Sequence, residues 1–328
     1  MGAERVLALG EGTSHADRVR RAGQRLLLAV DRVDGDLRHL VREVRPAGFV
    51  VGLQEEPAAT LAIARELTAL TDPARPPLLA AEGLGSWPDE ATLGRAEVHA
   101  AEQGAALALE LLAQGLNLLL GPRGDLGATG LSGDPQRASR QLSDLVEAAA
   151  GAGLGLCLTG FPGSTHGEVE VELPVLVGEL LRPFRAGLAR GAGAVRLAWA
   201  TYPALDEERP APLSPRVVSR LLRGGGFDGL VLATVAETRP GRMVAGAQAA
   251  SVDLLQIPSD GSAVEGLFVS LIHADERGET PGAADSAARV HAWRESHLLG
   301  AGPRPPLEVV GCRAHQSLAA LIRLRGAP

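Results

Sequence analysis

The strongest constraint on the fold is a regular alternation of short apolar runs with longer segments of helical pattern. Each run spans five or six residues and is almost continuously apolar, as is typical of parallel strands buried on both faces. Each is followed by a helical segment, so the sequence predicts a (β/α)₈ TIM-type barrel; an open doubly wound sheet is the alternative. The runs are Arg25–Val30, Gly48–Leu53, Pro77–Ala81, Leu116–Leu120, Leu154–Leu158, Ala194–Trp199, Gly229–Ala233 and Asp253–Ile257.

Helix boundaries are marked by capping residues and prolines. Asp134–Pro135 predicts an N-cap followed by a first helical residue, with the helix ending near Gly151. Ser214–Pro215 predicts a second helix start of the same kind. Ser262 and Glu265 have the spacing of a capping box after the eighth run. These signals support the assignment of helices between the strands.

The chain is predicted to be one domain with a short extension. Residues 1–300 form the barrel, and residues 301–328 add a proline-rich joint, a strand pattern over Leu307–Gly311 and a helix over His315–Arg325. Gly160–Pro174 interrupts the alternation as a long, acidic, glycine-rich loop after the fifth run. Loops at the C-terminal ends of barrel strands carry binding groups, so we expect this loop to border the site.

Composition narrows the functional class. A net charge of −7 and an isoelectric point near 5.7 argue against nucleic-acid binding. Two cysteines are too few for a disulfide framework or a cysteine metal site, and the histidine spacings suggest no zinc site; no metal or cofactor is predicted. The sequence shows no signal peptide and no apolar stretch of about 18 residues, so we expect a cytoplasmic protein without membrane contact. The oligomeric state is left open.

Polar residues just past the predicted strands are candidates for ligand binding. Glu82 ends the third run, Arg123 and Asp125 follow the fourth, and Trp199 ends the sixth. Each has a structural alternative: Asp125 would cap a turn, and Trp199 would pack in the core. A sugar ring is the ligand for which hydrogen-bonding carboxylates and an aromatic face are suited.

Candidate catalytic groups lie in the long loop and after the seventh run. His166 is a candidate acid/base because histidine as a residue type exchanges protons near neutral pH, and its alternative is a solvated surface histidine. Glu168 and Glu170 alternate with valines, a pattern that first indicates a half-exposed strand. Glu237 follows the seventh run closely enough to reach inward. A weaker alternative is a phosphate site at Ser259–Ser262, where a helix begins after the eighth run.

Several motifs together resemble the N-terminal barrel of glycoside hydrolase family 3, closest to its single-domain β-N-acetylhexosaminidases. The resemblance spans Gly23–Leu299 and is strongest over Leu181–Thr234, which holds Tyr-Pro-Ala-Leu-Asp, Ser-Pro and Gly-Phe-Asp-Gly. Phe161–Gly163 matches the centre of the family's Lys-His-Phe-Pro-Gly motif, and Leu173–Pro174 matches the end of its catalytic loop. The resemblance implies a β-N-acetylhexosaminidase fold acting on amino sugars of the cell wall.

The departures from the family cluster at its chemistry. Thr234 stands where the family has its nucleophilic aspartate. The Lys-His pair becomes Thr159–Gly160, and the family's acid/base Asp and His align with Glu168 and Glu170. A threonine hydroxyl cannot take the place of a carboxylate that stabilises an oxocarbenium-like centre and then leaves.

Three further family positions differ. Glu82 replaces a sugar-binding aspartate, Thr129 lies near an arginine position, and Trp199 replaces a histidine; Asp125 alone carries over. We therefore expect a family 3-like barrel that has lost the usual hydrolytic machinery and binds an amino sugar, a cell-wall fragment or a protein partner. The alternative is an active O-glycosyl hydrolase with relocated acidic residues. Whether the tail is the remnant of a second domain stays open.

Overall fold

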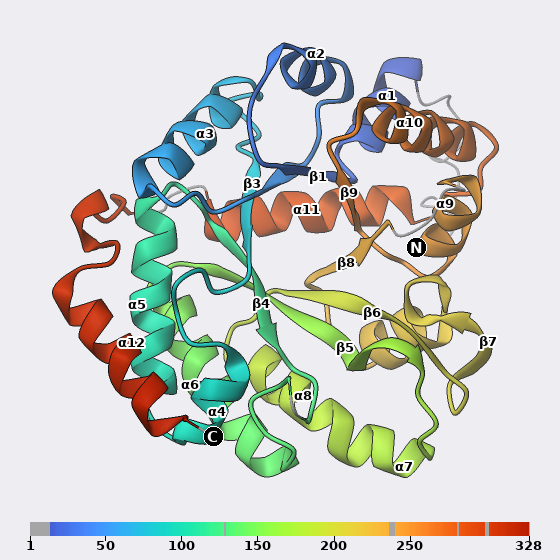
Figure 1. The fold of residues 1–328 in the computed structure, drawn as a ribbon. Helices are drawn as coiled ribbons and strands as arrows, with labels where there is room; N and C mark the ends of the chain where they lie inside the picture. The colour runs from blue at the N-terminus through green and yellow to red at the C-terminus, as the bar shows by residue number, and fades with distance from the viewer. Residues whose placement is uncertain (1–13, 128, 236–239, 281, 299–301, 328) are drawn as a thin grey trace, which may run out of the picture.

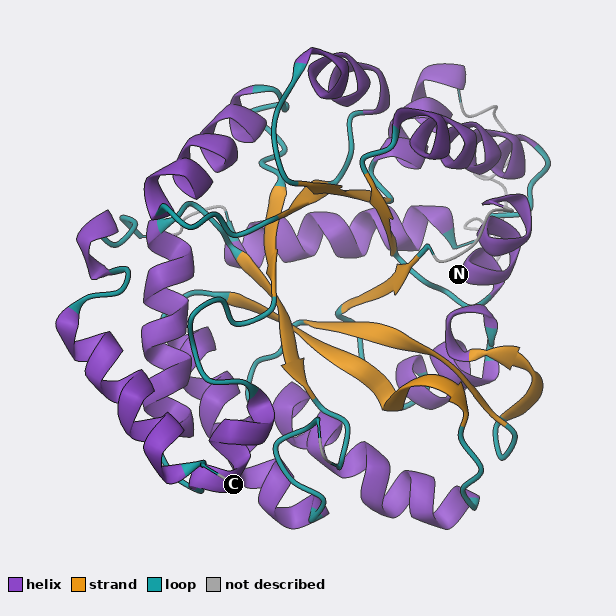
Figure 2. Cartoon of the chain, viewed as in Figure 1, coloured by secondary structure: helices purple, strands orange, loops and turns teal. Residues whose placement is uncertain are grey.

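The computed structural model describes residues 14–127, 129–235, 240–280, 282–298 and 302–327 as a closed parallel barrel inside a layer of helices (Figures 1 and 2). Eight of its described strands pair side by side in parallel, in the cyclic order β1-β2-β3-β4-β5-β6-β8-β9. The ring closes because β9 pairs with β1, Leu255 lying opposite Leu26. The short strand β7 pairs antiparallel with β6 outside the ring. The predicted TIM-type fold is confirmed.

The elements follow one another in strict alternation over most of the chain. The strands are β1 (Leu26–Val30), β2 (Gly48–Val51), β3 (Leu78–Glu82), β4 (Leu118–Arg123), β5 (Gly155–Glu168), β6 (Ala194–Tyr202), β7 (Asp206–Pro210), β8 (Leu230–Thr234) and β9 (Leu254–Pro258). The helices are α1 (His15–Gly23), α2 (Gly35–Val44), α3 (Pro57–Ala69), α4 (Glu90–Ala96), α5 (Ala100–Ala113), α6 (Pro135–Gly151), α7 (Leu173–Val175), η2 (Leu176–Leu180), α8 (Leu181–Ala189), η3 (Ala211–Leu213), η4 (Arg216–Arg223), α9 (Pro240–Ala249), α10 (Gly261–Glu276), α11 (Ala283–His297), η5 (Leu307–Val309) and α12 (Arg313–Arg325).

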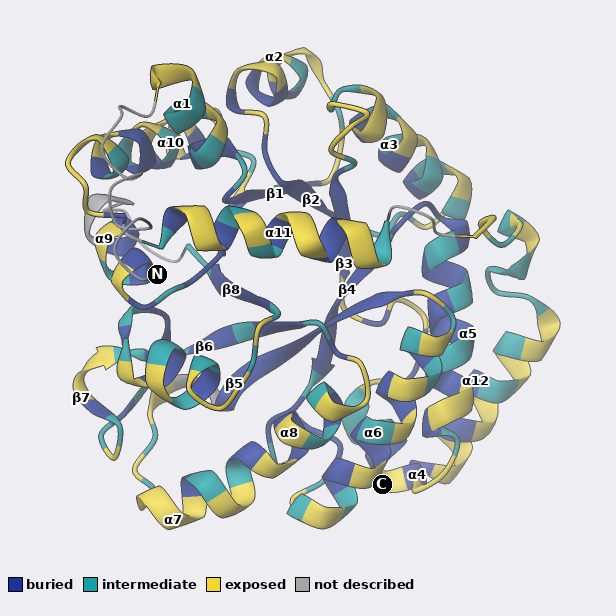
Figure 3. Ribbon diagram, turned by 180° about the vertical axis from the view of Figure 1, so that it is seen from behind, coloured by how far each residue is buried: buried dark blue, intermediate teal, exposed yellow. Residues whose placement is uncertain are grey.

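The strands contribute to two apolar clusters, one on each face of the ring. Alternate residues such as Leu26 and Leu28 pack against the helices, whereas Leu27 and its counterparts on other strands fill the barrel. Helix α11 crosses one end of the barrel (Figure 3) and adds Val290 and Trp293 to the interior cluster. We call this end the foot and the opposite end, where the strands finish, the mouth. The foot is therefore closed by apolar packing, and only the mouth can present polar groups on the barrel axis.

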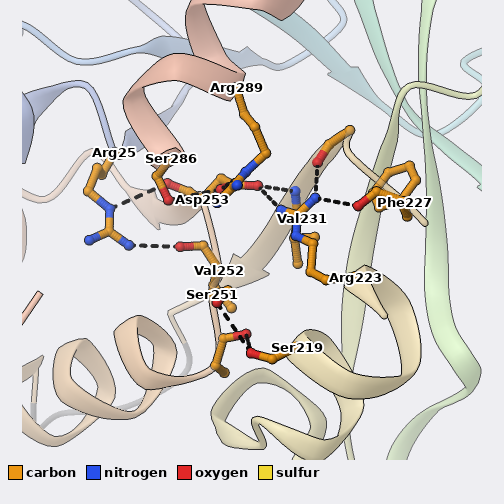
Figure 4. Close-up of polar contacts among 12 residues, drawn as sticks. Arg25, Ser219, Arg223, Phe227, Val231, Ser251, Val252, Asp253, Ser286 and Arg289 are labelled. Carbon is orange, nitrogen blue, oxygen red and sulfur yellow. Dashed lines mark hydrogen bonds and ion pairs between the residues drawn. The ribbon is translucent and has the colours of Figure 1, made fainter. Parts of the chain in front are cut away.

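A buried ionic cluster ties the foot together around Asp253, which is fully buried at the start of β9 (Figure 4). Its carboxylate accepts hydrogen bonds from Arg223 (2.5 Å), Arg289 (2.8 Å) and the Ser286 hydroxyl (2.9 Å). It also accepts from the backbone N–H of Val231 at 2.8 Å. One side chain thus joins β8, β9, η4 and α11.

The C-terminal extension docks on the outside of the barrel through Glu110, a residue of α5 that is 5% exposed. The Glu110 carboxylate accepts from the Trp87 indole N–H (2.9 Å) and the Gly311 backbone N–H (2.9 Å), and lies 2.7 Å from Nδ1 of His315. The extension was predicted as a strand and a helix. The helix is present as α12, but the predicted strand Leu307–Gly311 begins as the 3₁₀ turn η5, because it pairs with no strand and its Gly311 N–H is bound by Glu110.

The eight predicted strands are all present, with shifts of one to three residues at most ends. The predicted cap is confirmed at Asp134, which accepts from Arg137 N–H. Ser214 accepts from Val217 N–H, but η4 begins at Arg216, so Pro215 takes the N-cap place. Ser262 is not an N-cap: Asp260 caps α10 by accepting from Ala263 N–H, and Ser262 donates to that same carboxylate. An ionised carboxylate two residues earlier is the stronger acceptor, so it takes the cap.

The predicted loop Gly160–Pro174 is the clearest difference in secondary structure. Its first half continues β5 to Glu168 and pairs with β6, Gly167 lying opposite Ala200 and Glu168 opposite Thr201. The glycines in this segment make it look like a loop in the sequence. It forms a strand because β6 extends past the barrel and its backbone groups pair with those of β5, with two shifts of register. No helix in the described part of the chain has the length and hydropathy needed to cross a membrane.

Candidate active site at the barrel mouth

The centre of the mouth holds an ion pair that crosses the barrel. Arg196 of β6 donates from one terminal nitrogen to Glu82 at the end of β3 (2.6 Å) and to Gln256 of β9 (3.1 Å). The Gln256 amide in turn donates to the second Glu82 oxygen at 3.1 Å. Since β3 pairs with neither β6 nor β9, these contacts can form only through the interior. The Glu82 side chain remains 46% exposed, so its carboxylate still faces solvent while both of its oxygens are held.

A second carboxylate at the mouth is held by a second arginine. Asp125, 5% exposed, accepts from Nε of Arg123 at 3.0 Å and from a terminal nitrogen at 2.7 Å. These hydrogen bonds raise the pKa of the Arg123 guanidinium above its ordinary value. Glu90 accepts from the backbone N–H of Arg123 at 3.2 Å, and burial raises the pKa of the Glu90 carboxyl. Asp125 is thus the charge partner of a neighbouring arginine.

Gly160 explains how Asp125 fits beside β5. Its φ is +89°, and a Cβ built there would lie 3.0 Å from Oδ1 of Asp125. A side chain would therefore be both strained and crowded at this position. Thr159–Gly160, where the family resemblance places a Lys-His pair, has a backbone suited to Asp125 and excludes a histidine side chain in this conformation.

The end of β8 is covered by an aromatic ring. The indole N–H of Trp199, at the mouth end of β6, donates to the backbone carbonyl of Thr234 at 2.7 Å. Both residues are partly buried. The indole therefore lies directly against the position where the resemblance places a nucleophilic aspartate. The hydrogen bond orients the ring and leaves part of its surface accessible at the mouth.

The remaining catalytic candidates differ in how much of their surroundings the structure describes. Glu168 and Glu170 are exposed, the first in the extension of β5 beyond the barrel and the second just after it. His166 lies in the same extension with its backbone opposite Trp199, and its side chain lies outside what the structure describes. Glu237 falls outside the described residues. Neither Glu168 nor Glu170 makes an ion pair with a described residue.

The structure brings Glu82 together with two residues that the sequence analysis missed, Arg196 and Gln256. Both interrupt apolar runs, as Val-Arg-Leu and Leu-Gln-Ile. In a strand, a polar residue between two apolar ones points to the opposite face from its neighbours. That signal could have indicated polar groups inside the barrel, although it could not have paired them across it.

The predicted phosphate alternative at Ser259–Ser262 is contradicted by the charge at the start of α10. The Asp260 carboxylate accepts from Ala263 N–H at 3.0 Å and from the Ser262 hydroxyl at 2.7 Å. These hydrogen bonds hold the pKa of Asp260 below its ordinary value, so it stays ionised. An anion at this helix start would meet a fixed negative charge that already uses the free donors.

Solved structures with the same fold superpose on this chain over most of its length. A glycoside hydrolase family 3 β-N-acetylglucosaminidase from Paenibacillus sp. FPU-7 superposes with a TM-score of 0.83 at 23% identity, over 94% of this chain and 68% of that one. A β-N-acetylhexosaminidase from Beutenbergia cavernae gives a TM-score of 0.73 at 20% identity, over 87% of this chain and 99% of that one.

Sequence comparison agrees with the fold. A β-hexosaminidase from Xanthomonas campestris is 34% identical over 174 residues, which are 47% of this chain and 50% of that protein. One from Stenotrophomonas maltophilia is 35% identical over 173 residues, 48% of this chain and 50% of its own length. The chain is therefore similar to curated β-hexosaminidases over about half of its length. No family model matches the sequence.

The sequence matches cover only part of each protein. The alignments span about half the length of the curated relatives. The resemblance predicted from motifs is confirmed, and the barrel fold is what this chain shares with the solved structures. What the mouth does chemically depends on the side chains described above.

Proposed function

We propose that the mouth of this family 3-type barrel binds an amino sugar or a cell-wall fragment carrying one, without the double-displacement hydrolysis of its relatives. The observation that carries the proposal is the Trp199–Thr234 contact: an indole is hydrogen-bonded to the backbone of the threonine that the resemblance aligns with the family's nucleophile. The relatives are named as β-hexosaminidases and β-N-acetylglucosaminidases, which supports an amino sugar as the ligand.

Retaining hydrolysis needs a free carboxylate on one side of the sugar and a proton donor on the other, about 5 Å apart. At the described mouth, Glu82 is held by Arg196 and Gln256, and Asp125 by Arg123. A carboxylate neutralised by a guanidinium is a poor nucleophile but remains a good acceptor for sugar hydroxyls. This arrangement favours binding over bond cleavage.

Two measurements on the purified chain test the proposal. With an aryl β-N-acetylglucosaminide, we expect no release of the aryl group above the buffer rate, and calorimetry should show saturable binding of N-acetylglucosamine. Trp199→Ala should weaken this binding about tenfold, the equivalent of about 1.4 kcal/mol of stacking between the indole and the sugar ring. Arg182→Ser, on the exposed side of α8, serves as the matched control and should change nothing.

Substantial turnover that is abolished by Glu168→Gln, Glu170→Gln or Glu237→Gln would overturn the loss of hydrolysis. Failure of any amino sugar to bind would overturn the binding function. Thr234→Asp adds a further check: we expect it to stay inactive, because restoring one carboxylate supplies no acid/base partner.

The second candidate is an active glycosidase with relocated acids. It is favoured by one observation, the exposure of Glu168 and Glu170 on and just after the β5 extension, where neither is neutralised by a described arginine. It predicts that a mechanism-based fluoro-sugar labels one of these glutamates covalently. Binding of the sugar without labelling would favour the first proposal.

A further inference from the structure

Several arginines gather at the foot of the barrel, where they have no part in the proposed sugar-binding site at the mouth. Two clefts of about 340 Å³ and 290 Å³ adjoin there and share Arg20, Gln24 and Arg75. Arg42 and Arg45 complete the lining of the first, and Arg21, His291 and Arg294 belong to the second. Asp72 is the one carboxylate among the described residues that line either cleft. This basic surface is set against a chain whose net charge is −7.

Four of the six arginines that line these clefts have no acidic partner among the described residues. Arg20 pairs with Asp17, Arg21 with Asp275, and His291 lies 3.5 Å from Glu295. Within the residues that the structure describes, no carboxylate pairs with Arg42, Arg45 or Arg75. Asp72 instead accepts from the backbone N–H of Ala74. The first cleft is therefore lined by three arginines that form no ion pair with a described carboxylate.

Arg294 is a buried arginine of the second cleft that also has no described acidic partner. It is 4% exposed, and it donates to two neutral acceptors, the backbone carbonyls of Pro76 (3.0 Å) and Ala47 (2.9 Å). Burial, with a smaller contribution from the positive charge of Arg75, lowers the pKa of its guanidinium to about 10. A buried cation without a counter-charge is unfavourable, and an anion in the adjoining cleft would relieve it.

Helix ends account for the sign of some of these charges. Arg20, Arg21 and Arg42 lie in the last turns of α1 and α2, where cations offset the partial negative charge of the carbonyls. This stabilisation of the helix ends does not require the arginines to lie close together, since each could stabilise its own helix while pointing to solvent. Their convergence with Arg75 on shared clefts is the feature that indicates a ligand.

We propose that this basic foot binds a small soluble molecule carrying two linked phosphate groups, held where the two clefts meet at Arg20 and Arg75. Guanidinium groups match phosphate oxygens in charge and geometry, and a diphosphate offers more oxygens than a single phosphate to the several arginines that line these clefts. The volumes together lie in the range of small-molecule sites. The site is separate from the sugar-binding mouth and does not depend on it.

Calorimetry with inorganic pyrophosphate and with orthophosphate on the full chain tests the proposal. We expect saturable pyrophosphate binding, at least about tenfold tighter than orthophosphate, and weaker at 200 mM than at 50 mM salt. Arg75→Ser should weaken pyrophosphate binding about tenfold, and Arg42→Ser by a smaller factor. Both side chains are exposed and make no described ion pair, so the variants should fold.

Arg182→Ser is the matched control, because it removes one exposed arginine far along the chain on α8. Its affinity for pyrophosphate should equal that of the unmodified protein. The proposal is overturned if pyrophosphate gives no saturable binding, if orthophosphate binds equally well, or if Arg182→Ser weakens binding as much as Arg75→Ser.

Discussion

Replacing Asp253 by alanine is expected to be among the most destabilising single changes at the foot of the barrel. The carboxylate is fully buried and accepts four hydrogen bonds, two of them from arginines. Arg223 and Arg289 are themselves 13% and 22% exposed in their side chains. Removing the carboxylate would leave both guanidinium groups near the interior without a counter-charge.

The size of the effect follows from the burial of these ion pairs. Breaking a buried ion pair by removing one partner costs about 3–5 kcal/mol of unfolding free energy. With an unfolding entropy of about 2.1 cal/mol/K per residue, a chain of 328 residues has about 0.7 kcal/mol/K in total. The Tm should therefore fall by about 4–7 °C. Asp253→Asn should forfeit most of the same stability, because an amide nitrogen would face an arginine.

The assay is thermal unfolding followed by circular dichroism, with Asp144→Ala as the control. Asp144 is exposed on α6 and makes no described side-chain contact, so its removal should change the Tm by less than about 1 °C. A Tm for Asp253→Ala within about 2 °C of the unmodified protein would refute the reasoning. It would mean that the ionic cluster contributes little beyond the apolar closure of the foot.

Three further predictions concern the extension, the thiols and pH. Glu110→Ala should remove two contacts to the extension, from Gly311 and His315, and one from Trp87. It should lower the unfolding free energy by about 3 kcal/mol and speed hydrogen exchange of α12 more than of the barrel strands. Burial raises the pKa of the Cys157 thiol to about 12, so a thiol reagent at pH 8 should label Cys312 and leave Cys157 unreacted until unfolding. Burial lowers the pKa of His297 below its ordinary value of about 6.5. Between the two values the unfolded chain binds more protons than the folded one, so the free energy of unfolding should decrease as the pH falls. Urea titrations at pH 7 and pH 5 should show a smaller decrease in the free energy of unfolding for His297→Gln than for the unmodified protein.

Much of the fold was predictable because the signals are local. Each barrel strand is buried on both faces, so its apolar run stands out along the chain, and Asp134 before a proline marks a helix start whatever the tertiary context. The predicted secondary structure was wrong where it depended on pairing with a neighbouring strand. The glycine-rich start of Gly160–Pro174 became strand because β6 lay beside it, and Leu307–Gly311 did not become strand because it lacked a neighbouring strand.

The sequence predicted individual residues of the candidate site, but not which of them contact one another. Glu82, Asp125 and Trp199 follow predicted strands, and this places them at the mouth of any parallel barrel. Their partners are far away in sequence: Arg196 lies 114 positions from Glu82, and Thr234 lies 35 positions from Trp199. The roles of the catalytic candidates His166, Glu168, Glu170 and Glu237 stay predictions.

The sequence by itself determined the alternation of strands and helices, the family resemblance, and the threonine where that resemblance places a nucleophile, because each is written in consecutive residues. The tertiary structure decided that the mouth carboxylates are held by arginines, that an indole covers the end of β8, and that arginines from separate helices meet at the foot. These contacts depend on the closure of the ring, which brings side chains from non-adjacent strands within hydrogen-bond distance. The amino-acid sequence supplies those side chains, and the closed barrel sets which of them meet.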